Sequence, residues 1–307
     1  MFDGILIIDK PEGITSHDVV SRCRRILKTK KIGHTGTLDP FATGVVVILV
    51  GKATRLAQFL DKDAKEYLAT VRLGFETDTG DRTGVRREEE KGRRGEEEIV
   101  SFEEIEAVLK DFRGEIWQTP PMYSAKKVEG KKLYELARKG IEIERKPVKI
   151  NIYELELISE HNENNFPFSA FHFPLKVVCS AGTYIRVLAE DIGKKLNIGA
   201  HLEELRRTAA GKFKIENALT LEELEKQVAE NNLENHPVSM NEAISHLAEV
   251  KLNAEDIAKI KNGVKLRKDL PESKDGDFLR FSDGTNLLAI GFYNEAEKTV
   301  QPKLVLV

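Results

Sequence analysis

The sequence predicts an α/β protein built from two domains. In the first 246 residues, apolar runs typical of strands alternate with segments of helical spacing. From about Leu247 the elements become short, and residues 278–293 alternate as a hairpin with Asp283 and Gly284 at its turn. A length of 307 residues also suits two domains of ordinary size. We therefore assign residues 1–246 to a larger domain and residues 247–307 to a small, largely β domain.

Spacing and capping signals place the individual elements of the first domain. Thr15 or Ser16 can cap a helix that runs to about Leu27, and Ser101 with Glu104 forms a capping box for a helix over 101–112. Residues 76–98 are rich in charge and are predicted to form a solvated hairpin or insertion. The other expected elements are strands at 4–9, 45–50, 67–73, 148–158 and 166–178, and helices at 52–61, from Tyr184 and over 251–263.

The composition is that of a globular protein. A hydrophobic content of 40% supports a packed core, and the longest apolar run is too short to span a membrane. The N-terminal residues lack the basic region and cleavage site of a signal peptide. Cys23 and Cys179 have no metal-binding spacing, and the seven histidines include no pair spaced for a helical zinc site. We expect a cytoplasmic protein with buried thiols, without a metal site or membrane contact.

Charge is unevenly distributed along the chain, although the net charge is only -3. Residues 1–60 and 114–150 each hold nine Lys or Arg against five acidic residues, whereas residues 219–250 hold seven acidic residues and one Lys. Part of the first basic segment is the helix face with Arg22, Arg24, Arg25 and Lys28. Such segregation is expected of a protein that binds a polyanion on one face, although charged residues on solvated helices would give the same distribution of charge along the chain. The acidic stretch is interpreted as a linker helix.

The stretch GHTGTLDPFATGVVVILVGKATR, residues 33–55, is the most informative one. A polar loop with three glycines carries one carboxylate, Asp39, and leads directly into the apolar run 45–50, which has the pattern of a buried strand. Because Asp39 precedes Pro40, its backbone is restricted to extended geometry. Either a polar strand connection or a ligand site fits this pattern.

Three other features are open to a structural and a functional interpretation. Tyr67 at the start of a strand is an ordinary strand aromatic or a stacking surface. Arg186 in the first turn of a helix opposes the helix dipole, so it calls for a facing carboxylate or phosphate, or for a buried ion pair. Residues 118–146 combine lysines with aromatics and fit either a nucleic-acid clamp or a soluble surface loop.

Several familiar motifs are absent from the sequence. The run GVVVILVGKAT lacks the first glycine and the Ser or Thr of a phosphate-binding loop, because Val46 and Ala53 occupy those positions. The GxxG at Gly33–Gly36 is a weak match to a KH loop. No Gly-x-Ser-x-Gly, Cys/His pair or paired carboxylates are present.

Six tracts together resemble the tRNA pseudouridine-55 synthase (TruB) family, in its bacterial form with a C-terminal RNA-binding PUA domain. They occur in the same order over nearly the whole chain: KPEGITS, GHTGTLDPFATGVVVILVGKATR, KEYLATVRLG with TDTGD, QTPPMYSAKKVEGKKLYELARKG, CSAGTYIRVLAEDIG and GAHLEELRRTAAG. The resemblance implies a catalytic domain with a mixed, mostly antiparallel sheet and flanking helices. It further implies an enzyme that flips and isomerises uridine 55 in the T loop of tRNA without a cofactor, and we expect it to act as a monomer.

The resemblance also assigns roles to individual residues. Asp39 matches the catalytic aspartate, acting as a nucleophile or base, Arg186 matches the arginine that pairs with it, and Tyr67 matches the tyrosine that stacks on the base. RNA or substrate contacts are implied for five further residues, of which His34 would fill the space left by the flipped nucleotide: Lys10, His34, Arg55, Tyr184 and Leu205. Arg55 stands where many relatives have Lys, which changes the geometry of the charge. Residues 118–146 correspond to a thumb segment that orders on RNA.

Two other functions remain open from the sequence. A non-catalytic tRNA-binding or tRNA-folding chaperone would use the same folds. A nucleoside hydrolase based on Asp39 is disfavoured, because the sequence places no second carboxylate to activate water.

Overall fold

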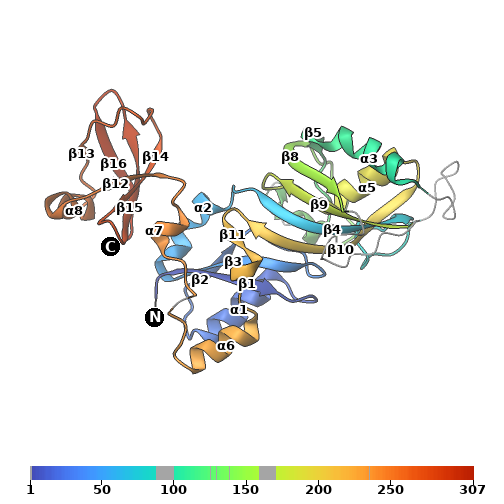
Figure 1. The fold of residues 1–307 in the computed structure, drawn as a ribbon, viewed down its shortest axis with the longest axis horizontal. Helices are drawn as coiled ribbons and strands as arrows, with labels where there is room; N and C mark the ends of the chain where they lie inside the picture. The colour runs from blue at the N-terminus through green and yellow to red at the C-terminus, as the bar shows by residue number, and fades with distance from the viewer. Residues whose placement is uncertain are drawn as a thin grey trace.

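The chain forms a large and a small lobe, each with its own sheet (Figure 1). This computed structural model describes residues 2–87, 100–124, 126–128, 130–137, 139–158, 171–234 and 236–307. In those residues, no helix has the length and apolar character needed to cross a membrane.

One nine-stranded sheet organises the large lobe. Its order is β1-β3-β10-β4-β9-β8-β5, with β2 beside β3 and β11 beside β10. The pairings are antiparallel except for a short parallel contact of β10 with β3, so the predicted mixed, mostly antiparallel sheet is confirmed. The strands are β1 (Gly4–Lys10), β2 (Ile32–Thr35), β3 (Thr43–Val50), β4 (Lys65–Gly74), β5 (Gly114–Gln118), β8 (Val148–Leu157), β9 (His172–Cys179), β10 (Gly199–Ala210) and β11 (Phe213–Lys214).

The central strand β10 is the element that the sequence pattern identifies least well. It runs for 12 residues between β3 and β4, whereas the sequence indicates only a short strand after Arg206. Register shifts against β4, between Leu202 and Glu204 and between Arg207 and Ala209, interrupt the alternation that marks a strand. The pairing of β10 with its neighbours therefore depends on contacts that are distant in sequence.

Helices cover the sheet at both ends (Figure 1). Both predicted N-caps are present, and each forms a capping box: Thr15 begins α1 (Ser16–Ile26), and Ser101 begins α3 (Phe102–Leu109). Because each cap satisfies backbone N–H groups at its helix start, both starts follow from local sequence. The other helical elements of this lobe are η1 (Gly51–Leu56), α2 (Ala57–Leu60), η2 (Lys110–Phe112), α4 (Leu133–Ala137), α5 (Ile185–Lys195), η3 (Ile215–Asn217), α6 (Leu221–Ala229) and α7 (Met240–Ala243).

The acidic stretch is not a linker, which corrects the sequence analysis. Helix α6 buries Leu221 and Leu224 in the same core cluster as Val19 and Cys23 of α1. A hydrophobic face is therefore the reason why this helix packs on the large lobe, with its glutamates on the outside.

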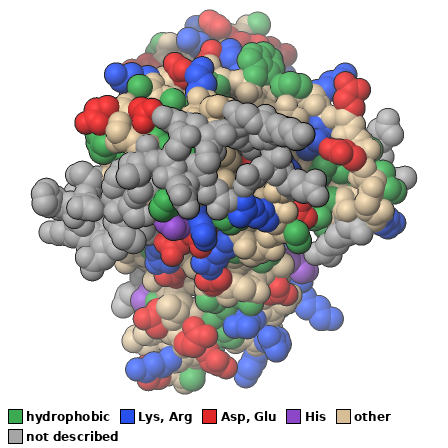
Figure 2. Space-filling view, turned by 90° about the vertical axis from the view of Figure 1, so that its right-hand side faces the viewer, with side chains coloured by type: hydrophobic (Ala, Val, Ile, Leu, Met, Phe, Trp, Pro, Cys, Tyr) green, Lys and Arg blue, Asp and Glu red, His purple; other side chains and the backbone are tan. Residues whose placement is uncertain are grey.

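The same packing reduces the free basic surface of α1. Arg22 and Arg25 line a groove opposite Glu222 and Glu225 of α6, and Arg24 is half-buried and donates to the Ile32 carbonyl. Figure 2, which views the molecule from the right-hand side of Figure 1, shows Lys and Arg side chains interspersed with Asp and Glu side chains on that face. Counting charges along the sequence thus overstates the basic patch.

The small lobe contains a five-stranded sheet in the order β12-β14-β15-β16-β13. The predicted hairpin is confirmed, because β14 and β15 pair antiparallel and Asp283 accepts the N–H groups of Thr285 and Asn286 in the turn. The elements are β12 (Ala248–Lys251), α8 (Ala254–Lys261), β13 (Leu266–Arg267), β14 (Phe278–Ser282), β15 (Leu287–Asn294) and β16 (Thr299–Val305). Residues 118–146 of the large lobe contain the small hairpin of β6 (Lys127–Val128) and β7 (Lys131–Lys132), followed by α4.

Candidate active site

The loop between β2 and β3 holds Asp39 in a fixed position. On one side, the Ser16 hydroxyl donates to the Leu38 carbonyl at 3.2 Å and accepts the Leu38 N–H at 2.9 Å. On the other side, the Pro40 carbonyl accepts a hydrogen bond from the Lys10 ammonium at 3.0 Å. The loop is therefore tied to α1 and β1 on both sides of the carboxylate, as a reactive group on a rigid support requires.

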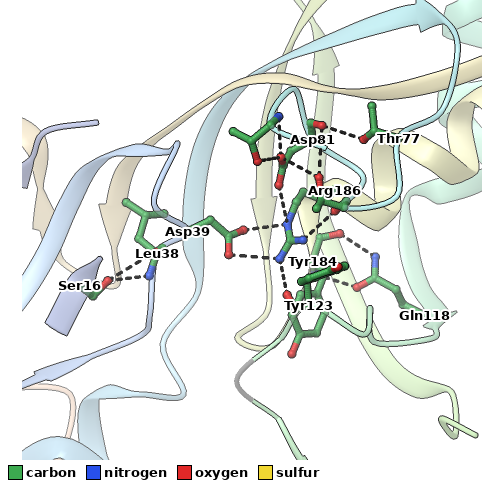
Figure 3. A network of polar contacts seen from close by, with 11 residues as sticks. Ser16, Leu38, Asp39, Thr77, Asp81, Gln118, Tyr123, Tyr184 and Arg186 are labelled. Atoms are coloured by element: carbon green, nitrogen blue, oxygen red, sulfur yellow. Dashed lines mark hydrogen bonds and ion pairs between the residues drawn. The ribbon is translucent and has the colours of Figure 1, made fainter. Parts of the chain in front are cut away.

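The Asp39 carboxylate faces the Arg186 guanidinium in a bidentate ion pair (Figure 3). Arg186 Nε donates to Oδ2 at 2.8 Å, and Nη2 donates to Oδ1 at 3.1 Å. The remaining donors reach the carbonyls of Thr79 and Tyr123, each at 2.8 Å. The Arg186 side chain is 5% exposed, whereas the Asp39 side chain is 34% exposed. An oriented carboxylate is thus presented to solvent by a buried guanidinium.

A second carboxylate, Asp81, lies on the other side of Arg186, 3.8 Å from Nε. The hydroxyls of Thr79 and Thr83 donate to Asp81 Oδ1 at 2.9 and 2.6 Å. The predicted hairpin is present, because Thr77 and Arg86 form an antiparallel bridge, but it is only partly solvated, since Asp81 is buried; residues 88–99 lie outside the described residues. Two carboxylates beside one guanidinium explain why an arginine is stable in the first turn of α5.

Asp39 and Arg186 lie in the wall of a cavity of about 270 Å³. Tyr67 of β4, Leu205 of β10 and Tyr184 at the N-cap of α5 line the same cavity. The fold therefore brings together five of the eight residues that the sequence analysis assigned to the site, from segments more than 100 residues apart.

The two tyrosines of the cavity differ in what holds them. Tyr67 is 8% exposed, and burial raises the pKa of its phenol, with Arg207 opposing the shift. Tyr67 is therefore a neutral phenol near pH 7, with a ring available for stacking. The backbone of Tyr184 exchanges two hydrogen bonds with the Gln118 side chain, 2.8 Å to its N–H and 3.0 Å to its carbonyl, which ties α5 to β5 (Figure 3).

The other three predicted residues lie outside the lining of this cavity. Lys10 is fully buried, and its ammonium donates to three backbone carbonyls, one of them that of Pro40. Burial lowers the pKa of Lys10 to about 8. His34 lies on β2, where burial lowers its pKa and its Nδ1 has no hydrogen-bond partner among the described residues. Arg55 donates to the Val305 carbonyl of β16, so in this structure it joins the lobes instead of lining the cavity.

Among the cavity residues that were not assigned to the site from the sequence, four matter for the chemistry: Asp61, Lys65, Ser124 and Arg207. Arg207 lies two residues after Leu205, so a strand assigned over 199–210 would have placed both side chains on one face. Asp61 is a second carboxylate in the wall, and its Oδ1 accepts the Gly36 N–H at 3.1 Å. The sequence analysis had expected no such group. Ser124 Oγ is buried and has no partner among the described residues.

The cysteines are buried, as predicted. Both are free, and burial raises the pKa of Cys23 to about 12 and that of Cys179 to about 11, so both are thiols at neutral pH. In the described part of the chain, no three His, Cys, Asp or Glu side chains are grouped closely enough to bind a metal ion.

Comparison with known proteins gives consistent matches along the chain. Residues 24–185 match the TruB family pseudouridylate synthase (N terminal domain), and residues 186–250 match the tRNA pseudouridylate synthase B C-terminal domain. The chain is 44% identical to tRNA pseudouridine synthase B of Geobacillus thermodenitrificans, over 93% of this chain and 90% of the relative. It is 41% identical to the Bacillus subtilis protein of the same name, over 100% of this chain and 98% of the relative.

Solved structures of two macromolecular complexes contain chains with the same fold. An H/ACA RNP bound to a substrate RNA containing 2'-deoxyuridine includes a chain that is 27% identical, with a TM-score of 0.72 over 99% of this chain and 85% of that one. A Cbf5-Nop10-Gar1 complex gives 29% identity and a TM-score of 0.73 with the same coverage. With a family match over more than half of its length and such identity over nearly all of it, the chain belongs to the TruB family of pseudouridylate synthases.

Proposed function

We propose that this enzyme converts uridine 55 in the T loop of tRNA to pseudouridine, with Asp39 as the group that attacks the nucleotide. The observation that carries the proposal is the ion pair of Asp39 with Arg186 in the wall of a cavity that Tyr67 and Leu205 also line. Relatives named tRNA pseudouridine synthase B at 41–46% identity support tRNA as the substrate.

The reaction is an isomerisation that needs one well-placed carboxylate. The N1–C1′ bond of uridine breaks, the base turns, and a C5–C1′ bond forms, while C5 loses a proton and N1 gains one. Asp39 can serve by attack at C1′, by addition to the pyrimidine ring or by removal of a ribose proton. In each route the two hydrogen bonds from Arg186 hold the carboxylate oxygens in one orientation.

A cavity at this depth requires that the nucleotide leave the RNA stack. Flipping a base costs a few kcal/mol, and stacking on an aromatic ring is worth about 1–3 kcal/mol. In our proposal the ring of Tyr67 supplies that stacking, Tyr184 and Leu205 contact the nucleotide, and His34 fills the gap in the RNA. His34 is suited to packing in a base stack because burial lowers its pKa and so keeps the ring neutral.

The remaining parts of the chain are proposed to hold the RNA. The thumb segment, residues 118–146, closes over the T arm, and the small lobe, residues 247–307, acts as a PUA-like RNA-binding domain beside the catalytic domain 1–246. Lys10 acts through the Pro40 carbonyl rather than by touching RNA. We further propose that the enzyme works as a monomer in the cytoplasm, where it meets its proposed substrate, tRNA.

A tRNA labelled with tritium at C5 of uridine tests this proposal. Release of tritium with a product of unchanged mass is the expected result, and placing the label only at position 55 tests the site. Binding of tRNA without release would indicate the alternative, a non-catalytic tRNA-folding chaperone. Free uracil would indicate a hydrolase, for which Asp61 would be the second carboxylate.

A further inference from the structure

Two buried cations, Lys65 and Arg207, line the cavity and form no ion pair with a carboxylate among the described residues. Lys65 is 5% exposed, and its ammonium donates to the Asp63 carbonyl at 2.6 Å. Arg207 is 1% exposed and donates to the carbonyls of Val45 at 2.7 Å and Gly36 at 2.9 Å. Buried charges are normally paired with opposite charge, because desolvation otherwise makes them costly. Two such cations in one wall therefore require an explanation.

The two side chains converge from neighbouring strands on the residue that opens the Asp39 loop. Arg207 of β10 pairs in register with Tyr67 of β4, and Lys65 lies two residues before Tyr67. A Cβ on Gly36 would lie 3.4 Å from Lys65 Cε and 3.5 Å from Arg207 Nη1. Because Gly36 has no side chain, it does not cover either cation. Both cations therefore line the cavity together with Tyr67, the residue proposed to stack on the base.

The other charged groups of the cavity do not neutralise this pair. Arg186 is already matched by Asp39 and Asp81. Asp61 is exposed to solvent and accepts the Gly36 N–H, without an ion pair to Lys65 or Arg207. With Arg186 matched by Asp39 and Asp81, the cavity lining leaves the two cations Lys65 and Arg207 with one carboxylate, that of Asp61.

The burial of Lys65 and Arg207 indicates which part of the substrate these two cations would contact. The phosphates of a flipped nucleotide remain on the RNA backbone outside the protein, where a guanidinium that is 1% exposed does not reach them. The base is the part that enters the cavity. The charge of Lys65 and Arg207 is therefore directed at the pyrimidine ring.

Every route open to Asp39 moves electrons onto that ring. Attack at C1′, or removal of a ribose proton, expels uracil with both electrons of the N1–C1′ bond. Addition of the carboxylate to the ring pushes the C5–C6 π electrons toward O4. In each case the charge disappears when C5 bonds to C1′, C5 releases its proton and N1 takes one up, while the Asp39 carboxylate leaves C1′ or the ring, or returns the proton that it took from the ribose. Fixed cations at the site of developing charge lower such barriers strongly in a water-poor cavity.

We propose that Lys65 and Arg207 stabilise the negative charge that develops on the uracil ring while its bond to the ribose breaks. This inference rests on the proposed function and adds a role for two residues of the same cavity. Lys65 is the better residue to test, because Arg207 also holds β3 and the Asp39 loop through two backbone carbonyls.

The experiment compares Lys65→Met with Lys62→Met in single-turnover tritium release, with enzyme in excess over tRNA. Both variants lose one positive charge, but Lys62 is exposed and lies outside the cavity lining. We expect Lys65→Met to react roughly 100-fold more slowly than wild type, the size found when one transition-state donor is removed. We expect Lys62→Met to react within about twofold of wild type, and the tRNA affinities of the two variants to agree within about threefold.

A second substrate separates a charge-stabilising role from a structural one. Sulfur at position 4 carries negative charge more readily than oxygen, so 4-thiouridine at the target position depends less on the cations. The loss caused by Lys65→Met is expected to shrink from roughly 100-fold on uridine to about 10-fold on 4-thiouridine. Lys65→Gln, which keeps a donor for the Asp63 carbonyl, replaces Lys65→Met if circular dichroism shows that the latter does not fold.

Each result of these two comparisons either supports the proposed role of Lys65 or overturns it. A wild-type rate in the Lys65 variants, or an equal loss on both bases, overturns the role in charge stabilisation. A smaller loss on 4-thiouridine, with recovery in Lys65→Arg, supports it. If the wild-type enzyme itself forms no pseudouridine, the proposed function has failed, which is a separate result.

Discussion

Replacement of Gly44 by alanine should impair both the fold and the reaction, because this glycine is where the strand after the Asp39 loop meets the central strand. Gly44 pairs with Arg207 in the short parallel contact of β3 with β10 and has a φ of +105°. A Cβ at this position would lie 2.2 Å from the Arg207 carbonyl oxygen and 2.7 Å from its amide nitrogen. Both contacts are with backbone, so no side-chain rotation relieves them.

The expected effect has two parts. A side chain held at positive φ costs about 1–2 kcal/mol, and overpacking of a close contact costs about 1–3 kcal/mol. The free energy of unfolding should therefore fall by about 2–5 kcal/mol. To reach an ordinary contact distance, β3 and β10 must separate by roughly 1 Å, a displacement that can lower an enzymatic rate by about 100-fold. Asp39 lies five residues from the contact, and Arg207 lies at it.

Gly114→Ala provides the matched control. Gly114 lies at the start of β5 with a φ of +84°, and nothing approaches its Cβ position within 4 Å. This variant should lose only the backbone contribution, about 1–2 kcal/mol, and keep the wild-type rate. Urea unfolding measures the stabilities, and single-turnover tritium release below the unfolding range measures the rates. Equal behaviour of the two variants would refute the argument that close approach, and not backbone conformation alone, requires glycine at position 44.

Three further predictions concern the Asp39 carboxylate, a buried histidine and the small lobe. Asp39→Asn should abolish tritium release but leave tRNA affinity in filter binding within a few-fold, and turnover near wild type would exclude Asp39 as the attacking group. Burial lowers the pKa of His34 in the folded protein. As the pH falls below about 6.5, the unfolded chain therefore binds a proton at this residue more readily than the folded protein does. The free energy of unfolding should therefore decrease on acidification, less so in His34→Gln; parallel urea stabilities of the two proteins between pH 5.5 and 7.5 would contradict this. A chain ending at residue 246 should lose stability, because it lacks Leu287, Ile290, Leu304 and Leu306, each worth about 1.5–3 kcal/mol when buried, and an unchanged urea midpoint would argue against the packing described here.

Features encoded by a few neighbouring residues could be predicted from the sequence. The helix start at Thr15 and the turn at Asp283 depend on side chains that bond to backbone within three residues. The position of β10 could not be predicted in the same way, because its bulges disrupt the periodicity and the strands on either side of it, β3 and β4, lie more than 100 residues away. The acidic helix α6 was misassigned for a related reason: its glutamates dominate its composition, while two leucines decide where it packs.

The candidate site likewise contains some residues that the sequence could identify and others that it could not. Asp39, Tyr67 and Arg186 occur in tracts specific enough to be identified through a family resemblance. Lys65 and Arg207 carry no such mark, since a lysine and an arginine in charged segments are ordinarily solvated. Only the pairing of β4 with β10 reveals that both are buried beside the cavity. Sequence patterns therefore identified the carboxylate that we propose as the attacking group, and the tertiary structure was needed to find the buried cations beside the same cavity.

The alternation of β3 shows why the small lobe and the catalytic loop are mechanically linked. Val46, Ile48 and Val50 pack in the cluster that contains α1 and α6, whereas Val45, Val47 and Leu49 pack in the cluster that contains four large apolar residues of the small lobe. The continuous apolar run that marks this strand in the sequence is thus explained by cover on both faces, one of them supplied by a part of the chain more than 200 residues away. Two further contacts join the small lobe to the large one. Arg55 donates a hydrogen bond to the Val305 carbonyl, and the ring of Phe59 packs edge-on against the ring of Phe278. The small lobe, which we propose binds RNA, packs against the strand that anchors Asp39, so the proposed RNA binding and the proposed chemical step would share one rigid support.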